Sequence, residues 1–93
     1  MSHTTTAEQA HHAITTILTA RLPVAARGLA ERLEQRLGAN GLGFDSVTIV
    51  EVLLECEQHF DMPFPSSLFD AGPLTIGRLV EHATAGIVAR TQP

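Results

Sequence analysis

The sequence predicts an all-α fold, a small bundle of three main helices plus one short helix, with a long first loop. Several segments carry apolar residues at steps of three and four, which is the spacing of a helix face. No segment alternates apolar and polar residues with the period of a strand. Clusters of Gly and Pro separate the helical segments. The 93 residues suffice for one small domain, which we place at residues 7–90.

The N-terminal part is expected to contain one helix after a loose end. Residues 1–6 are polar and rich in Thr, so we expect a disordered N-terminal end. A helix is expected over 7–21, and Pro23 ends it because proline restricts the residue before it. The apolar face of this helix consists of Ala10, Ile14, Ile17 and Leu18. Residues 24–37 also have a helical spacing of leucines, which indicates either a helical insertion in the first loop, the interpretation we favour, or a break of the first helix.

The central element is an acidic helix expected over 46–60. Gly41 and Gly43 mark a turn before it, and the side chain of Asp45 or Ser46 supplies an oxygen that caps its free N–H groups. Four residues at steps of four, three and four form the stripe that we expect to face the core: Ile49, Leu53, Cys56 and Phe60.

The C-terminal third is expected to cross over before a last helix. Two prolines within 63–65 impose an extended segment. Residues 66–70 form at most one short helical turn, which depends on Leu68 and Phe69 docking into the core. The final helix follows Thr75, whose hydroxyl caps its first turn.

Composition and charge exclude several classes of function. The net charge of −4, from 6 basic and 10 acidic residues, disfavours nucleic acid as a partner and suits a basic protein. With four Phe and neither Trp nor Tyr, the chain lacks stacking platforms for bases. No apolar run is long enough for a membrane span, and no secretory signal is recognisable, so we expect a cytoplasmic protein. We also expect a monomer.

A second apolar stripe runs along the acidic helix beside the core stripe. It consists of Val47, Val50 and Leu54, and Glu51 and Glu57 form a charged rim around it. One interpretation is a wide stripe buried between two neighbouring helices. The other is an exposed surface that binds a basic and apolar partner. The spacing alone does not choose between them.

The residues before this helix carry a family resemblance. Leu42-Gly43-Phe44-Asp45-Ser46-Val47 resembles the Leu-Gly-x-Asp-Ser-Leu motif of acyl carrier proteins, and the similarity extends from 42 to about 85. The resemblance implies that Ser46 carries a covalent 4'-phosphopantetheine arm derived from coenzyme A, and that Asp45 assists the modifying transferase. A phosphodiester is physically suited to this place, because a helix N-terminus offers free N–H groups and a positive dipole end.

The resemblance also implies partners and a pathway class. The expected partners are a phosphopantetheinyl transferase and acyl-loading and condensing enzymes such as a ketosynthase, an acyltransferase or a ligase. The Gly-Phe-Asp-Ser form is closest to polyketide synthase carriers, whereas Val47 and Thr48 depart from fatty-acid carriers. An aminoacyl or peptidyl carrier of a nonribosomal assembly line and a fatty-acid carrier are the alternatives within the family. Outside it, the alternative is an unmodified helical interaction module. The initial Met suggests a free-standing carrier, although an excised domain would look similar.

The chain offers no convincing catalytic or metal-binding residues. The Gly-x-Ser-x-Gly motif of a hydrolase is absent, because Phe44 and Thr48 occupy its glycine positions. Cys56 lies in the core stripe and is expected to be a buried apolar residue. His11 and His12 point about 100° apart on a helix, so they cannot share one ion. We therefore expect a carrier that serves partner enzymes and catalyses nothing itself.

Overall fold

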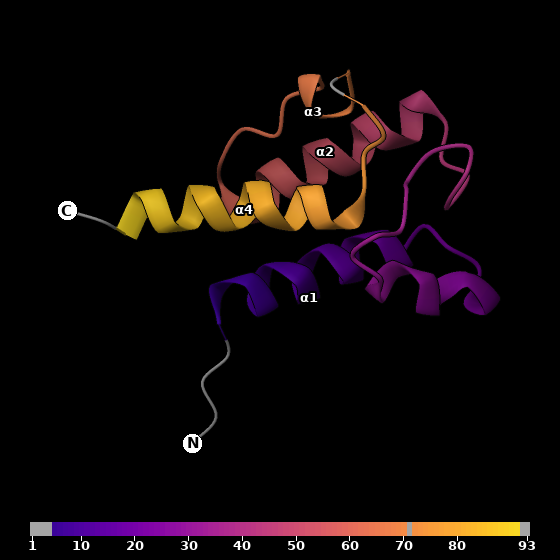
Figure 1. The fold of residues 1–93 in the computed structure, drawn as a ribbon, viewed down its shortest axis with the longest axis horizontal. Coiled ribbons are helices and arrows are strands. Elements are labelled where there is room, and N and C mark those ends of the chain that lie inside the picture. Colours follow the sequence, from indigo (N-terminus) through magenta and orange to yellow (C-terminus); the bar gives the residue numbers. More distant parts are fainter. Residues whose placement is uncertain (1–4, 71, 92–93) are drawn as a thin grey trace.

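A computed structural model of the chain describes residues 5–70 and 72–91. Its elements are α1 (Thr6–Thr19), the 3-10 helix η1 (Val24–Glu31), α2 (Ser46–Phe60), α3 (Ser67–Asp70) and α4 (Ile76–Thr91). α1 packs against α4, η1 and α2, and Figure 1 shows α1 and α4 side by side in opposite directions. Within the described ranges there is no strand, and no helix combines the length and the apolar content that would let it cross a membrane. The predicted bundle of three main helices, one short helix and a long first loop is confirmed.

The N-terminus of α1 is capped by a side chain. Thr5 has extended backbone angles and its hydroxyl accepts a hydrogen bond from the N–H of Glu8 at 3.1 Å. The helix therefore begins at Thr6, one residue earlier than expected, and it ends at Thr19. Residues 1–4, most of the expected disordered end, lie outside the described residues.

The helical insertion predicted for 24–37 is confirmed only as far as Glu31. η1 has the tighter hydrogen bonding of a 3-10 helix, and Ala30 is its buried residue. The hydroxyl of Thr15 on α1 donates to the carbonyl of Ala30 at 3.1 Å and so attaches η1 to α1. Beyond η1 the predicted helical turns are wrong, because the backbone there forms hydrogen bonds with a distant segment.

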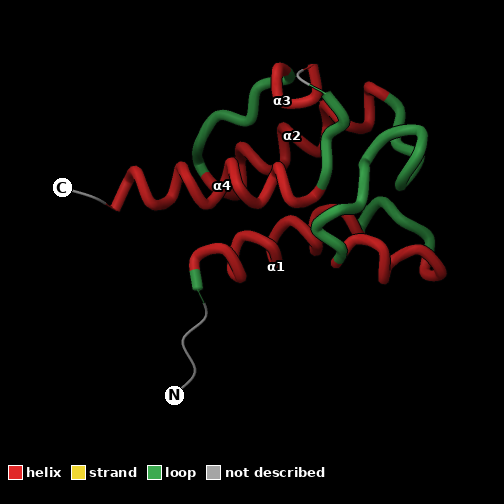
Figure 2. The backbone as a smooth tube through the Cα atoms, in the orientation of Figure 1, coloured by secondary structure: helices red, strands yellow, loops and turns green. Residues whose placement is uncertain are grey.

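The long first loop is tied to the start of α4. The N–H of Leu37 donates to the carbonyl of Leu74 at 3.0 Å, and the N–H of Gly77 donates to the carbonyl of Leu33 at 2.7 Å. The carbonyl of Leu37 in turn accepts from the N–H of Phe44 at 2.9 Å. The loop thereby gathers at the end of the bundle where α2 and α4 begin (Figure 2). This arrangement fixes the entry of the chain into α2.

The core stripe predicted on α2 is confirmed. All four of its residues are buried, and Val52 joins them: Ile49, Val52, Leu53, Cys56 and Phe60. They pack into one cluster with the buried faces of α1 and α4. α2 is therefore held on one side only, which leaves the opposite side of the helix free to carry a site.

Phe64 is the most deeply buried ring of the connection between α2 and α4. Its side chain is 2% exposed, and its ring stacks on that of Phe60 at 5.7 Å and meets the ring of His82 edge-on at 4.7 Å. Leu68 and Phe69, the anchors expected from the sequence, are only partly buried against the core. α3 thus lies on the surface of the cluster, while Phe64 holds the crossover to the core.

α4 is capped as predicted and continues through a glycine. The hydroxyl of Thr75 accepts a hydrogen bond from the N–H of Arg78 at 3.2 Å. The helix then runs to Thr91 past Gly86, although glycine is a poor helix former. The side chain of Met62 occupies the place where a Cβ of residue 86 would lie. Glycine at this position therefore lets the crossover pack closely on α4.

Candidate functional site at the start of α2

Asp45 and Ser46 have different roles at the N-terminus of α2. Asp45 has extended backbone angles, and its Oδ1 accepts a hydrogen bond from the N–H of Thr48 at 2.8 Å. The cap is therefore Asp45, one of the two residues the sequence offered for it. Ser46 is the first residue of the helix and is exposed. Because Asp45 performs the capping, the hydroxyl of Ser46 is available for another bond.

Free backbone N–H groups lie in the first turn of α2, beside Ser46. Ile49 N–H donates to the Asp45 carbonyl at 3.0 Å, and Thr48 N–H is used by the Asp45 side chain. The N–H groups of Ser46 and Val47 have no acceptor in residues 5–70 and 72–91. Together with the positive end of the helix dipole, these groups favour an anion attached to the Ser46 oxygen.

The loop that precedes Ser46 requires glycine at two positions. Gly43 has a φ of +80°, a conformation that most residues adopt only with strain. Gly41 lies so close to the carbonyl of Arg36 that a Cβ would collide with it. The turn is then closed by the hydrogen bond from Phe44 N–H to the Leu37 carbonyl. The Gly-x-Gly spacing before Ser46 therefore has a structural cause in this loop.

Two ionisable groups, the carboxylate of the N-cap Asp45 and the thiol of Cys56 within α2, depart from their ordinary pKa values. Hydrogen bonds from the backbone N–H and the side chain of Thr48 lower the pKa of Asp45, so this carboxylate stays charged at neutral pH. Burial, with a smaller contribution from the Glu55 carboxylate, raises the pKa of the Cys56 thiol to about 12. The thiolate is the reactive form of cysteine, so this raised pKa makes Cys56 unreactive. Cys56 is also buried, which confirms the expectation that it is a buried apolar residue.

The second apolar stripe of α2 is exposed. Val47 is 65% exposed, Val50 39% and Leu54 51%. The interpretation of a stripe buried by a second neighbour is therefore wrong for this fold. Singly exposed aliphatic residues are common on proteins, whereas three on one helix face beside Ser46 form a contiguous surface. We refer to Val47, Val50 and Leu54 as the docking stripe.

The carboxylates beside the docking stripe have partners within the chain. Arg21, which follows α1, places Nη1 at 3.2 Å from Oε1 of Glu51, and its Nη2 bonds to Oε1 of Glu55. Glu57 accepts a hydrogen bond from the N–H of Phe64 at 2.9 Å. Of the two rim residues that the sequence suggested, Glu51 is exposed and Glu57 is half-buried. Arg21 was not predicted to belong to this surface.

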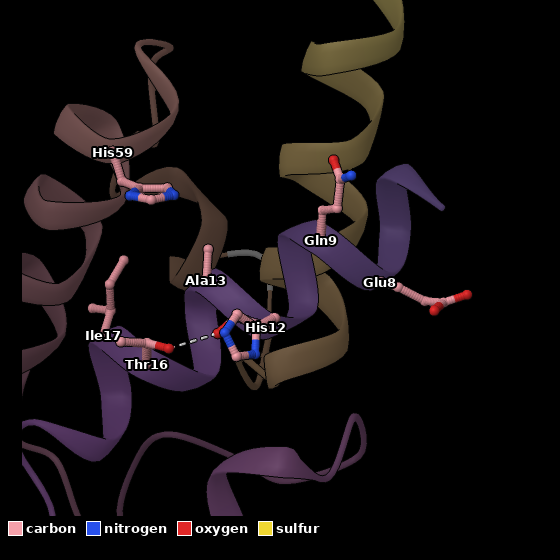
Figure 3. Close-up of a pocket in the computed structure, with 7 residues that line it drawn as sticks. All are labelled: Glu8, Gln9, His12, Ala13, Thr16, Ile17 and His59. Atoms are coloured by element: carbon pink, nitrogen blue, oxygen red, sulfur yellow. Dashed lines mark hydrogen bonds between the residues drawn. The ribbon is translucent and has the colours of Figure 1, made fainter. Parts of the chain in front are cut away.

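Two surface hollows flank α2 at opposite ends. The larger, of about 700 Å³, lies between α1 and the end of α2, with His12 and His59 at its wall (Figure 3). His59 follows Ser46 by 13 residues, roughly 20 Å along a helix, so this hollow is separate from the site. The smaller hollow, of about 260 Å³, includes Ile49, one turn from Ser46, and Phe69 of α3. The second hollow is therefore the one within reach of a group attached at Ser46.

The comparison with protein families identifies this region. Residues 39–83 match the family described as a phosphopantetheine attachment site. The chain carries a phosphopantetheine-binding domain. The resemblance to acyl carrier proteins is thereby confirmed. Comparisons with curated proteins and with solved structures give no match.

The prosthetic group of a phosphopantetheine-binding domain is covalently bound 4'-phosphopantetheine. The residues at the start of α2 fit such a group. An exposed hydroxyl on Ser46 offers the oxygen for a phosphodiester, and the free N–H groups of Ser46 and Val47 can stabilise its negative charge. Domains of this kind serve phosphopantetheinyl transferases and biosynthetic enzymes, and they are in general carriers without catalytic activity.

Proposed function

We propose that the protein is an acyl carrier that tethers acyl intermediates as thioesters on a 4'-phosphopantetheine arm attached to Ser46. The observation that carries the proposal is the exposed Ser46 hydroxyl, which begins α2 inside the matched region 39–83. The match ends before α4 does, but α1 and the rest of α4 contribute to the same core. This shared core supports a carrier domain spanning 7–90.

The residues of the chain hold the arm and supply no catalysis. Asp45 fixes the first turn of α2 and leaves the Ser46 oxygen free for the phosphodiester, and Asp45 also assists the transferase. The arm, when bound, ends in a thiol that forms the thioester with the cargo. The docking stripe, with Glu51 and Glu57 at its edges, receives the enzymes that load, extend and release that cargo.

The polyketide class is the pathway that we propose for this carrier, or a related route to natural products. Its support is the Gly-Phe-Asp-Ser sequence that ends at Ser46, together with Val47 and Thr48, which depart from fatty-acid carriers. The partners would then be a ketosynthase and an acyltransferase or ligase, and the protein would act as a cytoplasmic monomer. If an aminoacyl-activating enzyme loads the protein selectively, the carrier instead belongs to a nonribosomal assembly line.

Mass spectrometry tests the attachment directly. Incubation with coenzyme A and a broad-specificity phosphopantetheinyl transferase should add one phosphopantetheine group to the protein. Peptide mapping should place it on Ser46 and on none of the other serines, Ser2, Ser66 and Ser67. A chain that gains no mass under conditions that modify a known carrier is an unmodified interaction module, and the proposal would be wrong.

Exchanging Glu51 for lysine should slow loading by a cognate enzyme. The substitution places a second cation beside Arg21, which repels a basic partner surface. The rate should fall more at low than at high ionic strength, because salt screens interactions between exposed charges. Glu81→Lys on α4 makes the same change in net charge at another exposed position and serves as the control. Equal loading of both variants at every salt concentration would remove the electrostatic part of this proposal.

The segment containing α3 should open more easily than α2. Its four-residue helix has no fully buried residue, so the amides of Ser66 to Asp70 should exchange with solvent faster than those of Val50 to Glu57. Phe69 lines the hollow near Ser46, so loading a hydrophobic cargo should change the protection of these amides. Hydrogen exchange measured by mass spectrometry on the unloaded and loaded forms checks both statements. If these amides exchange slowly and loading does not change their exchange, the cargo does not enter this hollow.

A further inference from the structure

Arg21 holds a fixed position at the end of α1. It lies two residues beyond Thr19, and its N–H donates to the carbonyl of Leu18 at 3.0 Å. The next residue, Leu22, is buried in the core. The Arg21 side chain is 25% exposed. Its backbone is therefore anchored on both sides, and the guanidinium extends from a defined place onto α2.

The guanidinium spans two carboxylates on one edge of the docking stripe. Glu51 and Glu55 are four residues apart, so they lie one above the other on the same side of α2. Nη1 of Arg21 bonds to the first and Nη2 to the second. A planar guanidinium with several donors suits this pairing better than the single ammonium of lysine.

The other edge of the stripe is also occupied from within the chain. The Glu57 carboxylate accepts the hydrogen bond from Phe64 N–H. Each of the three glutamates of α2 therefore has an intramolecular partner. The apolar side chains between the two edges, Val47, Val50 and Leu54, remain exposed. A partner thus meets an apolar strip whose flanking acids are already engaged.

We propose that Arg21 is a specificity-determining residue of the docking stripe, an inference that rests on the proposed function. Arg21, Glu51 and Glu55 together carry one negative charge, whereas the two glutamates alone would carry two. Arg21 thereby weakens the attraction of this face for strongly basic surfaces. It selects enzymes whose docking patch is mainly apolar and only weakly basic, because most of their binding energy comes from the stripe and needs no displacement of the guanidinium.

Arg21→Gln tests this assignment because it frees both carboxylates and keeps a polar side chain. The probe is a broad-specificity phosphopantetheinyl transferase with a basic docking patch. At about 0.02 M salt, where screening is weak, the variant should be loaded with a kcat/KM about three- to tenfold above that of the original chain. The difference should vanish at about 0.5 M salt. Binding of the same transferase to Ser46→Ala forms with and without Arg21→Gln should show the same gain in affinity at low salt.

Two matched variants separate charge from structure. Arg21→Gln combined with Glu51→Gln restores the original net charge of the cluster without the ion pairs, so its salt dependence should return to that of the original chain. Arg21→Lys keeps the charge and should behave like the original chain in the loading assay. Circular dichroism confirms that each variant keeps its helices.

The possible outcomes distinguish this inference from the proposed function. Absence of mass gain in the original chain overturns attachment at Ser46, whereas the binding measurements on the Ser46→Ala forms still decide the role of Arg21. An Arg21→Gln variant that binds and loads like the original chain at low salt overturns the role of Arg21. A variant weakened equally at all salt concentrations also overturns it, because Arg21 would then act by direct contact or by positioning α2.

Discussion

Replacing Ser46 by alanine is expected to abolish the gain of mass with coenzyme A and transferase while leaving the fold intact. The substitution removes only an exposed hydroxyl. The cap of α2 is the Asp45 side chain, which the change does not touch, and alanine is a good helix former. Intact mass spectrometry should find the variant unmodified after the original chain has been fully converted. Thermal unfolding should give a midpoint close to that of the original chain.

Ser66→Ala provides the matched control for this loss. Ser66 is another exposed serine, and it lies just before α3. The same chemical change there should leave loading complete. If the Ser46→Ala variant is still modified, the arm is attached to another residue. Loss of loading in both variants would point to a general effect on the domain, and the assignment of Ser46 would then lack support.

Local sequence signals were sufficient to predict α2 and the position of Ser46. The bounds 46–60 agree with the structure, because a capping residue, an apolar period and a following pair of prolines all act within a few residues of the chain. The motif around Ser46 is contiguous in sequence, so its place at a helix start was readable without the structure. Exposure of the docking stripe was left open, since spacing does not reveal how many helices cover α2.

Long-range contacts account for what the sequence did not reveal. The leucine spacing over 24–37 predicts more helix than forms, because the backbone beyond Glu31 bonds to the start of α4 instead. Arg21 pairs with glutamates 30 and 34 positions away, and no local pattern links them. His82 also makes contacts that no local pattern predicts. It is half-buried against Phe64 and hydrogen-bonds to the Pro63 carbonyl at 2.6 Å.

The crossover after α2 contains one feature that the sequence predicted and one that it did not. The prolines correctly predicted an extended segment, and the short helix begins at Ser67, one residue later than expected. The choice of Leu68 and Phe69 as anchors followed from their place in that helix. The structure gives this role to Phe64, which is buried between Phe60 and His82 although it stands in the extended part. An apolar residue between two prolines has no periodicity that would reveal its burial.

Phe64→Ala is accordingly expected to lower the free energy of unfolding by about 3 to 5 kcal/mol, the usual loss for a fully buried phenylalanine. The ring is 2% exposed, and its removal leaves a cavity between α2 and α4 and deprives Phe60 and His82 of an aromatic contact. Since small domains are stable by about 5 to 15 kcal/mol in total, this is a large share. Urea unfolding followed by circular dichroism measures the loss.

Phe69→Ala removes the same ring from a partly buried place and makes the matched comparison. Its loss should be about 1 to 2 kcal/mol, because part of its apolar surface already contacts water in the folded state. Comparing the two losses in the free energy of unfolding therefore shows which ring contributes more to stability. If Phe69→Ala cost as much as Phe64→Ala, α3 would be anchored as firmly as the crossover, and its expected easy opening on cargo loading would lose its physical basis.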